Sequence, residues 1–180
     1  MKRVWMARVA LVCLIACGQL HAAHAGTGQQ DPLAIDGDTA TRIQYMYDQE
    51  KLALDLNWEF LGMWDDPLFQ SLGALERGQM GDLFSVMQAY GLEPLVATGT
   101  QGEYGHHDHT QAYSRLHSQG SASLLEAYQA IAYLEEWDIM ELNLRLYSVT
   151  ELQLAYSYGR MLRGAEDHLR EVLTEGGWLK

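Results

Sequence analysis

Acidic side chains interrupt the apolar faces of several predicted helices. Glu50 lies four residues after Met46, a spacing that places both side chains on one face of a helix. Glu76 and Glu135 occupy similar positions in two later segments, and His168 does so in the last one. Carboxylates in an apolar core are costly unless they are paired or bind a cation. Because helical proteins build metal sites from inward Glu and His side chains, these residues predict a divalent-metal site.

Three neighbouring residues extend this candidate set. Gln79 follows Glu76 by three residues, and Asp138 follows Glu135 by three, so each pair shares a helix face. Glu136 directly follows Glu135 and is a further candidate ligand. An alternative interpretation needs no metal. Each glutamate would lie at the edge of its apolar face beside an arginine, and the histidine would be a hydrogen-bonded core residue. The arginines considered are Arg77, Arg145 and Arg163.

A second group of histidines lies in a segment between two predicted helices. His106, His107 and His109 surround Asp108. Imidazole nitrogens suit Zn²⁺ or Cu²⁺, so the three histidines predict a second, weaker metal site at the surface. Neighbouring histidines do not easily face one ion, and Asp108 could instead cap the helix that follows. Both interpretations stay open.

Leu and Ala are abundant, and no segment alternates apolar and polar residues for long, so the sequence predicts an all-α fold. Strong periodicity indicates a bundle of four long helices with a long loop and a short helix between the second and the third. The expected long helices are 38–64, 67–90, 123–147 and 148–175, and the expected short helix is 110–118.

Several residues mark the ends and inward faces of these helices. Asp66 and Pro67 suit an N-cap and a first helical position. Two capping boxes, Ser123-x-x-Glu126 and Ser148-x-x-Glu151, are expected to begin the last two long helices. The residues expected to face inward in the first two helices are Ile43, Met46, Leu54, Leu61, Leu68, Leu72, Leu75, Leu83 and Met87.

The first 25 residues resemble a signal peptide. A basic start precedes an apolar run at 9–17 that is too short to span a bilayer. Cleavage after Ala25 predicts a periplasmic or secreted protein, whereas a lipobox ending at Cys17 predicts a membrane-anchored lipoprotein. Residues 26–37 then predict a flexible tether, and 38–175 the helical domain.

The chain is acidic, with 24 acidic and 12 basic residues and a formal net charge of −12. Three of the basic residues and no acidic one precede Gly26, so the processed chain would carry −15. Such a charge repels nucleic acid and attracts cations. We therefore expect a metal ion as partner, no nucleic acid, and membrane contact only through a lipid on Cys17. Cys13 and Cys17 both lie in the signal segment, so the processed chain would have no disulfide. The sequence does not indicate an oligomeric state.

Five segments together resemble a known family. They are Glu50-Lys51-Leu52-Ala53, the region around Glu76, Gly120-Ser121-Ala122-Ser123, Leu134-Glu135-Glu136-Trp137-Asp138-Ile139 and Asp167-His168-Leu169-Arg170. In order and spacing, over about residues 42–172, they resemble the ferritin-like domain of unknown function 2202. The resemblance implies a ferritin-like four-helix bundle, related in fold to rubrerythrins and ferritins, with a carboxylate site for a divalent metal, including a di-iron pair.

The chain departs from this pattern at three positions. Gln79 stands where Glu-x-x-His would place a histidine, Asn57 where a tyrosine is expected, and Ala165 where a fourth-helix ligand would be needed. An intact di-metal site, a mononuclear site and no site therefore all stay open.

The favoured function is an exported ferritin-like protein that binds metal in its core, with no reaction assigned. The first alternative is a non-catalytic interaction module of the cell envelope that has lost the di-metal site. The second is a metal chaperone that uses the histidines of residues 106–109.

Overall fold

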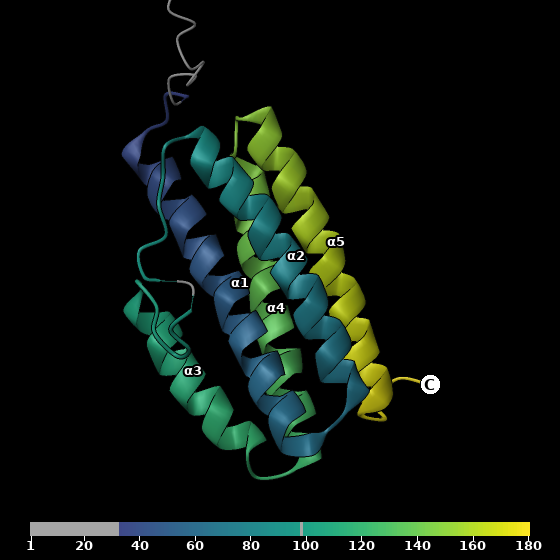
Figure 1. Cartoon of the computed structure of the whole chain (residues 1–180). Coiled ribbons are helices and arrows are strands. Elements are labelled where there is room, and N and C mark those ends of the chain that lie inside the picture. Colours follow the sequence, from purple (N-terminus) through teal and green to yellow (C-terminus); the bar gives the residue numbers. More distant parts are fainter. Residues whose placement is uncertain (1–32, 98) are drawn as a thin grey trace, which may run out of the picture. The chain divides into compact units, whose positions relative to one another are not determined.

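The computed structural model describes residues 33–97 and 99–180, which form five helices and, within these ranges, no strand. The helices are α1 (Gly37–Trp64), α2 (Pro67–Ala89), α3 (His107–Gly120), α4 (Leu124–Ser148) and α5 (Leu152–Glu175), as Figure 1 shows. The predicted all-α class is confirmed. The predicted signal peptide with Cys17, and most of the predicted tether, lie outside the described residues. No helix in these ranges is both long enough and apolar enough to cross a membrane.

The helices pack in two main pairs. In Figure 1, α1 runs beside α2, and α4 runs beside α5. The pairs meet where α1 contacts α4 and where α2 contacts α5, while α3 packs against α4 and α1. Helix α1 is therefore covered by three other helices, and this explains why it buries polar as well as apolar residues.

Two apolar clusters fill the interior. One contains Leu52, Leu72 and Leu134, and the other contains Met46 and Leu83. Along α1 the change from one cluster to the other falls between Met46 and Leu52, and along α2 it falls between Leu72 and Leu83. Between the two apolar clusters the helices therefore have a layer that holds buried polar side chains.

Predicted helix ends are confirmed at two junctions. Asp66 accepts a hydrogen bond from the backbone N–H of Leu68, and Pro67 is the first residue of α2. Ser123 accepts a hydrogen bond from the N–H of Glu126 at the start of α4. These caps satisfy backbone donors that have no partner inside the helix.

The predicted capping box at Ser148 is wrong. Ser148 is the last residue of α4, and its hydroxyl donates to the carbonyl oxygens of Leu144 and Arg145 in that helix. Helix α5 begins at Leu152, and its N-cap Glu151 makes no side-chain cap. The short helix is also longer than expected, because α3 spans His107–Gly120.

Some residues expected to face inward are not buried. Leu75 is 48% exposed, and Leu54 and Leu61 are only partly buried. The buried apolar residues of the C-terminal half of α1 are instead Leu52, Ala53, Leu56 and Phe60. For the two leucines of α1 the difference follows from the packing, because α3 covers a face of α1 that a single apolar stripe does not identify.

Candidate metal centre

Side chains from three helices meet in the layer between the two apolar clusters. Glu76 comes from α2, Glu135 from α4 and His168 from α5, and one ligand atom from each lies within 4.8 Å of the others. Nδ1 of His168 is 2.8 Å from Oε1 of Glu76 and 3.6 Å from Oε2 of Glu135. All three residues are buried. The structure thus brings together three of the residues that the sequence predicts as metal ligands.

Two further carboxylates lie buried beside this group. Glu50 on α1 is 1% exposed and Asp138 on α4 is 8% exposed. Both carboxylate oxygens of Glu50, Oε1 of Glu135 and Oδ1 of Asp138 are buried without a hydrogen-bond partner. Buried acceptors normally have a donor or a cation, so these four oxygens need an explanation. A divalent cation among them would provide it.

Burial and mutual repulsion disfavour the ionised carboxylates. Burial, reinforced by the charges of Asp138 and Glu76, raises the pKa of Glu50 well above its usual value. Burial and the charge of Glu135 do the same to the pKa of Asp138. Burial and the charge of Glu76 raise the pKa of Glu135 to about 8. Without metal, the layer therefore holds protons at neutral pH.

His168 carries a positive charge in this setting. Burial alone would lower its pKa, but its contacts with the Glu135 and Glu76 carboxylates outweigh burial and raise the pKa to about 11. The imidazolium offsets part of the negative charge of these carboxylates. Bound metal and the imidazolium proton would compete for the same oxygens.

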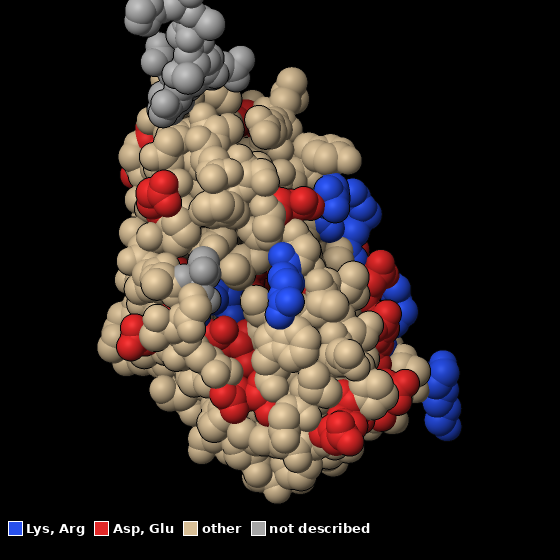
Figure 2. Space-filling view, in the orientation of Figure 1, with Lys and Arg blue, Asp and Glu red and all other residues tan. Residues whose placement is uncertain are grey.

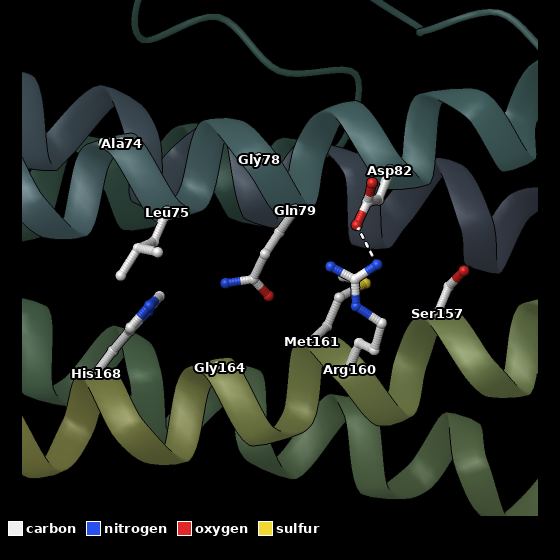
Figure 3. A pocket seen from close by; sticks show the side chains of 10 residues that line it. All are labelled: Ala74, Leu75, Gly78, Gln79, Asp82, Ser157, Arg160, Met161, Gly164 and His168. Carbon is white, nitrogen blue, oxygen red and sulfur yellow. Dashed lines mark ion pairs between the residues drawn. The ribbon is translucent and has the colours of Figure 1, made fainter.

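Gln79 lies at the edge of this group, facing a groove between α2 and α5. Figure 3 shows its side chain reaching from α2 toward α5, with His168 and Gly164 nearby on α5. The groove has a volume of about 360 Å³, and both Gln79 and His168 line it. An added Cβ at Gly164 would lie 2.9 Å from Nε2 of Gln79, so glycine makes room for the amide. The groove gives the buried group one side that opens toward solvent.

Other residues singled out in the sequence do not contribute ligand atoms to this group. Glu136 is exposed on α4 and lines a different depression. Asn57 is fully buried and its amide donates to the carbonyl oxygen of Ala53, while Ala165 is buried without a polar side chain. The arginines considered as partners do not reach the buried carboxylates: Arg145 pairs with Glu141, and Arg77 lies over the ring of Trp58.

The histidine-rich segment forms a separate group. His106 and His109 lie with Asp48 of α1, and one ligand atom from each is within 4.8 Å of the others. His107 is exposed, and its Nε2 is 2.9 Å from the side-chain nitrogen of Gln111. Sequence reasoning missed Asp48. The signal available was the unbroken polar run Asp48-Gln49-Glu50-Lys51, which a helix buried on several sides can hold.

The charged side chains of the visible face are unevenly placed. Figure 2 shows a mostly uncharged face with acidic side chains scattered over it, mainly in its lower part and along the right edge, where most of the visible Lys and Arg side chains also lie. This distribution agrees with the formal charge of −12. A surface of this kind attracts cations.

The fold and the buried group define an all-helical protein with a carboxylate–histidine cluster at its centre. The chain belongs to the family described as "Uncharacterized protein domain (DUF2202)", whose model matches residues 39–175.

A relative from the archaeon Methanocaldococcus jannaschii supports this family membership. The chain is 22% identical to "Uncharacterized protein MJ0754" over 125 residues, which cover 69% of this chain and 68% of the relative. The crystal structure of that hypothetical protein superposes with a TM-score of 0.77 at 19% identity, covering 81% of this chain and 83% of the other. At this identity the likeness establishes the shared fold.

Proposed function

We propose that this protein is an exported, ferritin-like metal-binding protein whose four long helices form a four-helix bundle around a divalent-metal site. Glu50, Glu76, Glu135 and His168 are the main ligands, and Asp138 and Gln79 assist them. The donor set is rich in carboxylate oxygen with one imidazole, which suits iron(II) or manganese(II). Both a single ion and a di-iron pair are compatible with four carboxylates.

One observation carries this proposal. Buried carboxylates of Glu50 on α1 and of Glu135 and Asp138 on α4 leave four oxygens without a hydrogen-bond donor. If this layer served only to pack the helices, apolar side chains would be more stable there, because each buried polar group without a partner lowers the folding stability by about 1–3 kcal/mol. The arrangement is reasonable if a cation is the missing partner.

The residues of the chain have distinct tasks in this proposal. Glu135 and Glu50 release their protons when a cation enters, and His168 gives up its proton so that a nitrogen lone pair becomes available. The groove beside Gln79 provides the route from solvent. A bound iron ion would supply redox or Lewis-acid chemistry, which the protein alone lacks.

Iron loading tests the proposal. Protein without a histidine tag is incubated with Fe²⁺ under anaerobic conditions, desalted, and measured by mass spectrometry for metal content. We expect one or two iron ions per chain and a thermal midpoint raised by more than about 5 °C, because a ligand that binds only the native state stabilises it. A stoichiometry near zero with an unchanged midpoint would contradict metal binding.

The interaction module is the second candidate function. It is favoured by Asn57 and Ala165, which are buried at positions where the family resemblance leads us to expect a tyrosine and a ligand, and which offer no carboxylate or imidazole. Under this hypothesis the buried carboxylates are protonated in the working protein, and the iron-loading experiment gives no bound metal.

Export is a separate part of the proposal. It rests on the basic start and the apolar run at 9–17, which lie outside the described residues. Intact-mass measurement of protein recovered from the cell envelope should show loss of residues 1–25, or loss of residues 1–16 with a lipid on Cys17. An unprocessed chain beginning at Met1 would contradict export by a cleaved signal.

A further inference from the structure

A second cluster of side chains that could bind a metal ion, Asp48, His106 and His109, lies on the side of α1 that faces α3. Asp48 and Glu50 are two residues apart on α1, and a helix turns by about 100° per residue, so their side chains point in nearly opposite directions. Glu50 faces the carboxylate layer, whereas Asp48 faces His106 and His109 at the start of α3. The two groups therefore share a helix but no side chain.

The contacts of Asp48 are incomplete. Its Oδ2 accepts from the backbone N–H of His106 at 3.0 Å and lies 2.7 Å from Nδ1 of the same residue. Its Oδ1 is buried and has no hydrogen-bond partner. Asp48 is 1% exposed, so solvent does not compensate this oxygen.

The ring of His109 also has a buried atom without a hydrogen-bond partner. The residue is fully buried, and its ring stacks on Trp137 at a centroid distance of 5.3 Å and packs against Tyr45 at 4.4 Å. Its Nε2 lies 3.3 Å from Oε1 of Gln49, and with this amide oxygen facing the ring, Nε2 is the protonated nitrogen. In this tautomer Nδ1 presents a lone pair. The atom is buried without a hydrogen-bond partner, and Oδ1 of Asp108 lies 3.8 Å from it.

We propose that Asp48, His106 and His109 form a mononuclear site for zinc(II), distinct from the carboxylate site in the core. Two imidazoles and one carboxylate are a typical ligand set for this ion, and three protein ligands leave a fourth position for water. Gln49 orients His109 through its second ring nitrogen, as outer partners of zinc-bound histidines do. The side chain of His106 is 20% exposed and provides access from solvent.

Zinc titration of matched variants tests this site. The tag-free protein is titrated with Zn²⁺ in competition with a chromophoric chelator, in a background carrying Glu76→Gln and Glu135→Gln so that the core site is disabled. We expect one equivalent of zinc in this background. Asp48→Asn and His109→Ala should each weaken binding by at least about 100-fold, because each removes a ligand. The control His107→Ala replaces an exposed neighbour and should change affinity less than about twofold.

Zinc-edge X-ray absorption of the same background should show scattering from two imidazoles. If Asp48→Asn and His109→Ala retain the parental affinity, or if His107→Ala loses as much, zinc binds elsewhere in the segment and the inference is wrong. Asp48→Asn conserves size, so it decides the question if His109→Ala does not fold. Zinc binding by the parent but not by the background variant would place zinc in the core, which overturns this inference and leaves the proposed function standing.

Discussion

The variant carrying Glu76→Gln together with Glu135→Gln is expected to lose stoichiometric iron binding. Glutamine keeps the shape of each side chain but removes the negative charge and the strong metal-ligand oxygen. One ligand atom from each of these two residues and one from His168 lie within 4.8 Å of one another. Because the variant loses two of these three ligands, we expect the affinity for Fe²⁺ to fall by at least about 100-fold. Anaerobic titration followed by metal analysis of the desalted protein measures this loss.

The matched control for this variant is Glu136→Gln. Glu136 is next to Glu135 in the sequence but exposed on α4, so its replacement should leave iron affinity within about twofold. Equal losses in the control and the double variant would indicate non-specific attraction of cations to an acidic surface. Unchanged affinity in both variants would place the bound iron outside the core. No iron binding by the parent protein would favour the interaction module, particularly if Glu50→Ala and Glu76→Ala then stabilise the protein by removing buried polar groups.

The metal-free protein is expected to become less stable as the pH rises from about 6.5 to about 8. Glu135 has a pKa of about 8 in the folded protein but about 4.5 when unfolded, so the folded state binds more protons across this range. His168, with its pKa raised to about 11, acts in the same direction. Each such group costs on the order of 1.4 kcal/mol of unfolding free energy per pH unit. Urea unfolding of metal-free protein at several pH values measures the slope.

Above about pH 6.5, His109 does not oppose this loss of stability. Burial lowers the pKa of His109 to about 4, so its contribution rises with pH only up to its ordinary value of 6.5. Glu135→Gln should flatten the slope above pH 6.5, whereas Glu136→Gln should leave it unchanged. A stability that rises from pH 6.5 to 8 in metal-free protein would contradict the protonated state of the core.

The fold could be predicted where local signals were strong. The Asp66–Pro67 junction and the Ser123 cap were correct because each depends on a few adjacent residues. The predicted N-cap at Ser148 was wrong because a serine hydroxyl near a helix end can donate to a carbonyl of its own helix as readily as it caps the next helix. The inward position of Leu75 was wrong because the pattern of α2 alone does not show which of its faces the neighbouring helices cover.

The candidate site could be predicted only in part, because the sequence shows helix faces but not how the helices pack together. Glu50, Glu76, Glu135 and His168 stand on apolar faces, and the structure places all four in the core. The spacing of three residues from Glu135 agrees with the burial of Asp138, whereas Glu136, the residue directly after Glu135, is exposed and was a wrong candidate. Asp48 was missed because a helix covered by three others buries positions that a single-face pattern assigns to solvent.

Anomalous diffraction at the iron edge, from crystals of tag-free protein loaded with Fe²⁺, locates iron bound in the core. We expect a peak in the layer between the two apolar clusters, within bonding distance of Glu76, Glu135 and His168. The absence of a peak there, with His168 still in contact with both carboxylates, would contradict iron binding in the core.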